Sequence, residues 1–300
     1  MTEHEPAADS PPQFRFSPPV ALGLSVGFVI LWALGAVVLE TLLALVKRSW
    51  NPQGPDLAAL VFLYTLVFAF FAWLALRHRR PLAAIGLKPS RPSALHWFIG
   101  LIIGAGGIAL AFAMIALGGG LSVVEGRADL GGTSSMGPYN WVVAALMFTL
   151  YAGEEEILSR GLVYPVLRSS IGFVGAVAVS SLAFCLMHIL NPEFTPLGAI
   201  DIFLAGVTLS LMRELTGDLF LAWGVHFGWN SAQIAAGVPV SGHLVQLQGY
   251  TWHLVATGPE WVTGGAFGPE GGIGGIMGNL ALIFLASALI IRKHRGATRL

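Results

Sequence analysis

Long apolar runs separated by short polar segments dominate the pattern of this chain. A helix needs roughly 17 to 25 apolar residues to cross the hydrocarbon core of a bilayer. About eight runs reach that length, at residues 20–46, 57–76, 94–117, 140–166, 172–190, 196–212, 219–237 and 276–291. The pattern predicts an all-α fold, a polytopic bundle of about eight transmembrane helices. The alternative is seven spans, with one run re-entering the membrane without crossing it.

The composition agrees with a membrane protein and excludes an ordinary soluble domain. Hydrophobic residues make up 55% of the chain and charged residues 11%, and the mean hydropathy is +0.74. The formal net charge is zero, and the basic residues are spread along the chain instead of clustering on one groove. We therefore expect the lipid bilayer as a partner and no nucleic acid.

Lys and Arg are distributed asymmetrically between alternate loops, which predicts the orientation because short cytoplasmic loops are enriched in basic residues. With eight spans one side carries only Lys47, Arg48 and Arg127. The other side carries Arg15, Arg77, Arg79, Arg80, Lys88, Arg91, Arg168, Arg213, Arg292, Lys293, Arg295 and Arg299. Both termini are therefore predicted to be cytoplasmic.

The predicted organisation is one membrane domain with two short tails. Residues 1–17, rich in Pro and acidic residues, are expected to form a disordered cytoplasmic tail. Residues 18–292 form the membrane domain, and residues 293–300 a basic cytoplasmic tail. The preference for Arg over Lys hints at a bacterial source, so we expect a multi-pass protein of the bacterial plasma (inner) membrane.

A cluster of charges interrupts the fourth apolar run and is the main clue to function. Glu154, Glu155, Glu156 and Arg160 lie at membrane depth, where each charge costs roughly 2.5 to 3.5 kcal/mol on insertion scales. Glu156 and Arg160 are four residues apart and can form an ion pair on one helix face. Glu155 points about 100° away from Glu156. A carboxylate held unpaired in a low-dielectric site suits a general base, and Glu155 is the candidate.

Two further polar groups recur at helical spacing in later spans. His188 follows Phe184 by four residues in the fifth run, and His226 precedes Asn230 by four residues in the seventh. The ring and the amide on α-helical spacing could together hold an oxyanion. Taken singly, a membrane histidine more often closes an interhelical hydrogen bond, and the Glu156–Arg160 pair could be a purely structural clasp. The conjunction of three polar spans predicts one shared cavity.

The order and spacing of these groups resemble a known family, the CPBP intramembrane proteases, also called the Abi or CaaX protease family. The resemblance covers roughly residues 140–237 and rests on three motifs, Glu155-Glu156-x-x-x-Arg160-Gly161, Phe184-x-x-x-His188 and His226-x-x-x-Asn230. It implies a multi-helix membrane endopeptidase related to the type II CaaX prenyl endopeptidase.

The same resemblance implies roles for the motif residues of this chain. Glu155 and His188 would activate water, and His226 with Asn230 would stabilise the oxyanion. Glu156 and Arg160 complete the first motif. No cofactor is favoured, because a zinc ion bound by Glu155, His188 and His226 would consume the groups needed as base and oxyanion donors. That zinc site is kept as the alternative, although the chain has no H-E-x-x-H motif.

The sequence therefore predicts an intramembrane endopeptidase that cleaves a membrane protein or a lipidated peptide, prenylated or bacteriocin-like. Two other classes stay open. One is a catalytically silent scaffold or immunity factor that uses the same cavity. The other is a proton-coupled transporter, because buried Glu, His and Arg also conduct protons; inverted repeats would support it, and the sequence has no evident repeat.

Overall fold

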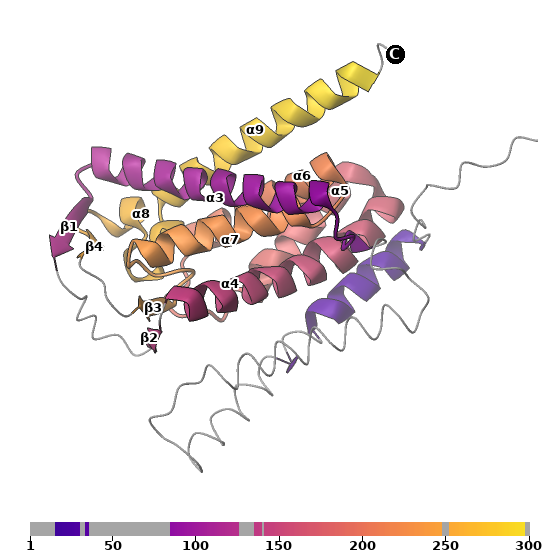
Figure 1. The fold of residues 1–300 in the computed structure, drawn as a ribbon. Helices are drawn as coiled ribbons and strands as arrows, with labels where there is room; N and C mark the ends of the chain where they lie inside the picture. The colour runs from indigo at the N-terminus through magenta and orange to yellow at the C-terminus, as the bar shows by residue number, and fades with distance from the viewer. Residues whose placement is uncertain are drawn as a thin grey trace, which may run out of the picture.

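The computed structural model describes residues 16–30, 34–35, 85–125, 135–139, 141–247 and 252–297. Helices dominate this part of the chain (Figure 1). After an N-terminal helix, Pro18–Ile30, the long helices are α3 (Arg91–Leu117), α4 (Trp141–Glu156), α5 (Tyr164–Met187), α6 (Pro196–Thr216), α7 (Phe220–Ala235) and α9 (Ile273–Ala297). A π-helix, η2 (Ile157–Val163), joins α4 to α5, and the short elements are α8 (Glu260–Thr263), η3 (Gly265–Phe267) and η4 (Pro269–Gly271).

The described residues also contain four short strands, which the all-α prediction did not include. β1 (Leu121–Glu125) pairs antiparallel with β4 (Trp252–Ala256), and β2 (Ser135–Tyr139) pairs parallel with β3 (Leu244–Leu247). They lie together at one end of the bundle (Figure 1). Strands of four or five residues give an alternating pattern that is too short to be recognised in the sequence.

Four helical stretches in the described part of the chain are long and apolar enough to cross a membrane: Arg91–Leu117, Ala144–Met187, Pro196–Thr216 and Ile273–Gly296. A helical membrane bundle is therefore supported, while the count of about eight spans stays a prediction. The predicted span 57–76 lies outside the described residues, and the span 20–46 is described only at its start. The predicted tail 1–17 is likewise almost entirely outside them. α9 continues as helix through residues 293–297 of the predicted basic tail.

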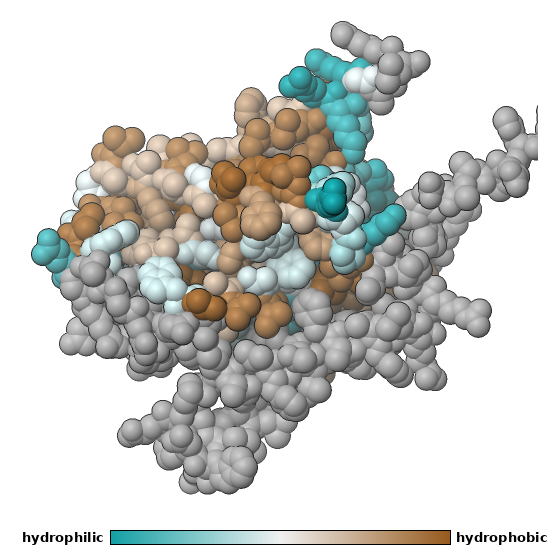
Figure 2. Space-filling model, in the orientation of Figure 1, coloured by the Kyte–Doolittle hydropathy of each residue, from teal (hydrophilic) through white to brown (hydrophobic). Residues whose placement is uncertain are grey.

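The surface of the bundle is apolar in the way that lipid contact requires. Large side chains of α3 and α9 stand exposed, among them Phe98 at 59%, Ile102 at 69% and Phe284 at 77%. Figure 2 shows hydrophobic side chains over much of the described face, with hydrophilic ones gathered at the end where α9 finishes. A water-soluble monomer rarely exposes contiguous apolar patches of this kind.

The charged end of the bundle is opposite the strands, where α3 begins and α9 ends (Figure 1). Arg168 pairs with Glu214 at 3.1 Å, and Lys293 Nζ donates to the carbonyl oxygen of Leu215 at 2.8 Å. Residues that the sequence analysis assigned to one side of the membrane thus lie close together. Which compartment this end faces stays a prediction.

Gly172 reverses the chain between the two predicted spans 140–166 and 172–190. Its φ of 78° and ψ of −177° break the helix inside α5, in a backbone region that only glycine enters readily. Glu155 and His188 lie at nearly equal distances along the chain from this break, about 25 Å on either side at 1.5 Å per residue. The two side chains therefore return to the same depth in the bundle, whereas one straight helix would hold them about 50 Å apart.

α7 is shorter than the span 219–237 predicted for it. Its 16 residues extend about 24 Å, less than the hydrocarbon thickness of about 30 Å. It begins after Asp218, whose carboxylate accepts a hydrogen bond from the backbone N–H of Phe220 at 3.0 Å, and it ends before Gly237, which has a φ of 72°. α7 is an internal helix packed against α3, α4 and α6.

α3 and α7 cross in backbone contact through four glycines. Gly100 and Gly104 face the backbone of α7, and Gly224 and Gly228 face the backbone of α3. Each pair has four-residue spacing, the small-xxx-small arrangement that lets membrane helices approach closely. A Cβ at any of these positions would collide with backbone atoms of the other helix. The crossing fixes α7, which carries His226 and Asn230.

We expect the substitution Gly104→Ala to destabilise the protein by about 1 to 3 kcal/mol, the usual cost of overpacking. Its added methyl would strike the backbone at Val225, which cannot move aside as a side chain can. The matched control is Gly106→Ala on the same helix, where nothing lies within 4 Å of the added Cβ. Thermal unfolding midpoints of both variants in detergent make the comparison, and equal midpoints would contradict the proposed close crossing.

Candidate active site

A buried ion pair forms the centre of the candidate site. Arg160 Nη1 donates to Glu156 Oε1 at 3.0 Å, and both side chains are fully buried. The i, i+4 pairing predicted from the sequence is therefore present. The same Glu156 oxygen accepts a hydrogen bond from Nδ1 of His226 on α7 at 3.1 Å. One carboxylate oxygen thus links η2 and α7.

The Arg160 guanidinium extends these contacts to two more helices. Its Nη2 donates to the carbonyl oxygen of Gly206 on α6 at 3.0 Å, and its Cζ lies 4.3 Å from the ring centroid of Phe184 on α5. Arg160 itself lies in the π-helix η2, and π-helical turns often occur at functional sites. A sequence pattern that assumes 3.6 residues per turn does not reveal this local widening.

Glu155 faces the two histidines. Its Oε2 lies 3.8 Å from His188 Nε2 and 3.7 Å from His226 Nε2, beyond hydrogen-bonding distance. This oxygen is buried and has no hydrogen-bond partner among the described residues. Spacing predicted that Glu155 points away from the Glu156–Arg160 pair, and the structure brings it to both histidines.

Hydrogen bonds fix the tautomer of each ring. His188 Nδ1 lies 2.9 Å from the carbonyl oxygen of Phe184, which can only accept, so Nδ1 carries the proton. His226 Nδ1 lies 3.1 Å from the Glu156 carboxylate and is the donor for the same reason. In their neutral forms both rings therefore turn an Nε2 lone pair toward Glu155, and three acceptor atoms converge.

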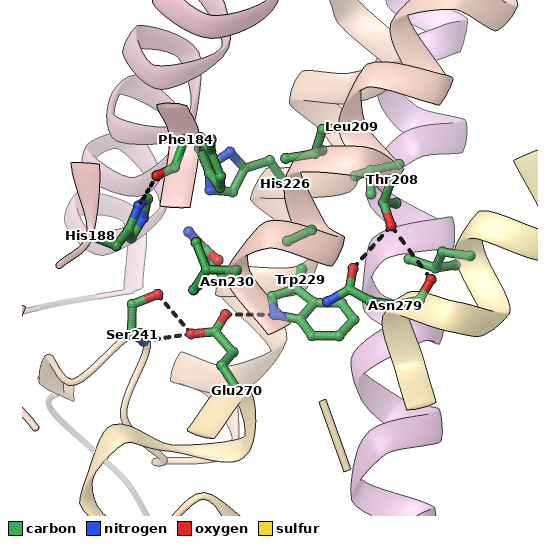
Figure 3. A pocket seen from close by; sticks show the side chains of 14 residues that line it. Phe184, His188, Thr208, Leu209, His226, Trp229, Asn230, Ser241, Glu270 and Asn279 are labelled. Carbon is green, nitrogen blue, oxygen red and sulfur yellow. Dashed lines mark hydrogen bonds between the residues drawn. The ribbon is translucent and has the colours of Figure 1, made fainter. Parts of the chain in front are cut away.

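Asn230 contributes a polar group to a small adjoining cavity. The cavity encloses about 30 Å³, room for about two water molecules. Asn230 lines it together with His188 and His226, as Figure 3 shows. Glu155 is not among the lining residues, so the two histidines are the groups shared by the cavity and the Glu155 cluster.

The donor set was also tested against the alternative zinc site. Two imidazoles and a carboxylate are zinc ligands in known enzymes. Nevertheless, in the described part of the chain no group of three or more His, Cys, Asp or Glu side chains is arranged to hold a metal ion. We therefore derive no step through a metal, and metal independence stays a prediction.

The polar lining of the cavity extends beyond the motif residues and was missed by the sequence analysis. It includes Thr208, Ser241, Glu270 and Asn279 (Figure 3). Thr208 Oγ1 donates to Asn279 Oδ1 at 3.1 Å, and Asn279 Nδ2 donates to Asp201 Oδ1 at 2.9 Å. These residues are dispersed over α6, the loop after α7, η4 and α9 without a recognisable spacing. The one available signal was Glu270 itself, an acid in the segment 238–275, which lacks Lys and Arg.

A comparison with protein families matches the region of the site. Residues 137–232 match the model described as Rce1-like, type II CAAX prenyl endopeptidase. This segment is a CPBP (CaaX protease) family domain. The matched range contains all six candidate residues, Glu155, Glu156, Arg160, His188, His226 and Asn230. No curated protein and no solved structure matches the chain significantly.

Loss of the buried cation should destabilise this family domain strongly. We expect Arg160→Met to cost about 3 to 5 kcal/mol, because it leaves the buried Glu156 carboxylate without its cation. The matched control is Arg168→Met, whose pair with Glu214 has side chains 43% and 24% exposed and contributes only about 0 to 1 kcal/mol. Chemical or thermal unfolding in detergent measures both, and a similar loss in the two variants would contradict the assignment.

Proposed function

We propose that this protein is an intramembrane endopeptidase that hydrolyses a peptide bond of a membrane-associated polypeptide with water activated by Glu155 and His188. The observation that carries the proposal is the buried Glu155 Oε2, which has no hydrogen-bond partner in the described residues and faces the Nε2 atoms of both histidines. Glu156 Oε2 and Asp201 Oδ2 are also buried without a partner there, so the position of Glu155 Oε2 beside two imidazole nitrogens is the feature that distinguishes it.

The geometry suits a bridging water. The polar atoms lie 3.7 to 3.8 Å apart, too far for a direct hydrogen bond and within reach of one shared water. A water held by Glu155 and His188 gives its proton to the carboxylate while its oxygen attacks the carbonyl carbon of the scissile bond. The C–N bond then breaks, and the protonated Glu155 returns the proton to the leaving amine nitrogen.

Asn230 and His226 stabilise the oxyanion in this scheme. The Asn230 amide lines the cavity beside His226, and its NH₂ group can donate hydrogen bonds. His226 already donates Nδ1–H to Glu156, so it can donate to an oxyanion only from a protonated Nε2. Its oxyanion role therefore requires the imidazolium form. The Glu156 carboxylate beside the ring provides a counter-charge for that form.

The space around the site supports a polypeptide substrate. The cavity at the histidines has room for little more than water. A second cavity of about 760 Å³ is lined by Pro192 and Gly242, and Gly242 follows Ser241 of the first cavity in the chain. Its volume is in the range of ordinary ligand sites, and its lining is largely apolar. We infer a membrane protein or a lipidated peptide as the substrate class, and the bacterial plasma membrane as the location.

The two other function classes lack comparable support. A silent scaffold or immunity factor would not need a carboxylate oxygen left without a partner between two fixed imidazoles. A proton-coupled transporter needs a chain of titratable groups across the membrane. Instead the polar groups of the site gather at one depth, since Glu155 contacts both histidines.

The direct test is the substitution Glu155→Gln. We expect a folded protein whose cleavage rate falls by at least about 100-fold, because the amide cannot take the proton of water. The measurement is protein-terminus mapping of membranes from matched cells that express wild-type or variant protein at equal levels. Termini present with wild-type protein and absent with Glu155→Gln would establish proteolysis and name a substrate.

A neighbouring acid supplies the control for this experiment. Glu154→Gln changes the adjacent residue of the same helix, about 100° around the axis from Glu155, and should leave the new termini in place. Identical termini for wild-type and Glu155→Gln protein, together with an unchanged cellular phenotype, would refute the peptidase and favour the scaffold.

Metal dependence is tested separately. We expect cleavage by purified protein to withstand a strong chelator, and metal analysis to find no stoichiometric zinc, because a zinc ion would occupy the groups that the proposal uses as base and oxyanion donors. Loss of cleavage with the chelator and its recovery with added Zn²⁺ would show that Glu155, His188 and His226 close around a metal instead.

A further inference from the structure

A third carboxylate, Glu270, lines the cavity at the histidines and lies outside the segment that matches the family model. It belongs to η4, and its side chain is only 4% exposed. Its two oxygens accept four hydrogen bonds. Trp229 Nε1 and Gln233 Nε2 donate to Oε1 at 2.8 and 3.0 Å, and the backbone N and Oγ of Ser241 donate to Oε2, each at 2.7 Å.

These four bonds fill the acceptor capacity of the carboxylate, because each oxygen has two lone pairs. Glu270 therefore has no free lone pair with which to activate a water or bind a cationic substrate group. Its role must come from what it holds in place. Figure 3 shows two of the groups it holds, Trp229 and Ser241, around the same cavity as Asn230 and His226.

The Trp229 and Gln233 donors lie on the helix that carries the oxyanion groups. Trp229 is adjacent to Asn230 in sequence and less than one helical turn from His226. The Trp229 ring extends toward α3 and α9, where a Cβ added at Gly107 or Gly278 would lie only 3.1 or 3.0 Å from ring atoms. Glycines make room for the indole, and Glu270 fixes its N–H. Together they set the depth and rotation of α7.

The Ser241 donors lie on the loop that follows α7. Ser241 adopts a φ of 46°, which is uncommon for a residue with a side chain. Its backbone N–H and its hydroxyl both bond Glu270, and its carbonyl oxygen accepts from Asn191 Nδ2 at 3.0 Å. Ser241 lines the cavity at the histidines, and Gly242 lines the larger cavity. The same carboxylate thus holds the wall between the two spaces.

We propose that Glu270 is a positioning residue for peptide hydrolysis, which sets the orientation of His226 and Asn230 through α7 and holds Ser241 at the junction of the two cavities. This inference rests on the proposed function. It adds a residue from the C-terminal part of the chain to a site whose motif residues all lie between α4 and α7.

The test replaces the Glu270 carboxylate, which accepts from four donors, by an amide that can accept with only one oxygen. In Glu270→Gln the new amide has one oxygen and one NH₂ group. The Ser241 backbone N–H cannot turn away, so the amide oxygen faces Ser241 and the NH₂ faces the Trp229 N–H, a clash of two donors. Gln233 can rotate its amide to accept, since its Oε1 has no partner among the described residues. Removing the indole N–H with Trp229→Phe therefore relieves the clash.

We expect Glu270→Gln to lower kcat by on the order of 10 to 100-fold, the scale of sub-ångström to ångström misplacement, with KM nearly unchanged. Adding Trp229→Phe should recover part of kcat instead of reducing it further. Glu125→Gln, an exposed acid of β1, is the control and should match the wild type. All rates are taken per folded protein, measured by size-exclusion chromatography, on the substrate identified by terminus mapping.

A readout independent of catalysis separates this inference from the proposed function. Hydrogen–deuterium exchange in α7 should rise in Glu270→Gln and return toward wild type in the double variant. The inference would be overturned if Glu270→Gln had the same kcat and the same α7 exchange as the wild-type protein. It would also be overturned if the double variant lost more activity than either single variant. If wild-type protein cleaves nothing, the peptidase fails, and the exchange result alone decides whether Glu270 positions α7.

Discussion

The buried Glu156–Arg160 ion pair is the constraint on which the rest of the site depends. Two charges removed from water cost more free energy than their attraction returns unless further hydrogen bonds satisfy them. Here His226 of α7, the Gly206 carbonyl of α6 and the Phe184 ring of α5 supply those contacts. The contacts of this one ion pair therefore hold four helical segments against each other. The hydrogen bond from His226 to Glu156 also fixes the orientation of the His226 ring.

The backbone, and not the ion pair, brings the functional side chains to the same depth in the bundle. The Gly172 reversal brings Glu155 and His188 to one level, and the glycine crossing lets α7 approach α3 closely enough to insert His226 between α4 and α5. Neither the Gly172 reversal nor the glycine crossing contributes a charged group to the site. A functional cluster inside a membrane thus depends on glycines remote from the chemistry, because interhelical distance and register decide whether polar groups meet.

Local spacing in the sequence was enough to predict the Glu156–Arg160 pair and the separate direction of Glu155, since both depend on one helical turn. The family match to residues 137–232 confirms the resemblance drawn from three motifs. The conjunction of the motifs predicted one shared cavity, but their spacing could not show how they meet, because their contact depends on the reversal at Gly172. The sequence analysis also overestimated the length of α7. It missed Glu270, because the hydrogen-bond partners Trp229, Gln233 and Ser241 come together only in the folded chain.

The carboxylates of the site differ in their hydrogen-bond partners and in the groups that their oxygens face. Glu156 Oε1 is shared by a guanidinium and an imidazole. Glu270 is filled by four uncharged donors. Glu155 alone of these three turns a buried oxygen, without a partner in the described chain, toward the nitrogens of two rings. Glu156 Oε2 is likewise buried without a partner in the described chain, so a free lone pair alone does not distinguish the two acids. The position of Glu155 Oε2 beside the Nε2 atoms of both histidines is what supports its proposed role as the base.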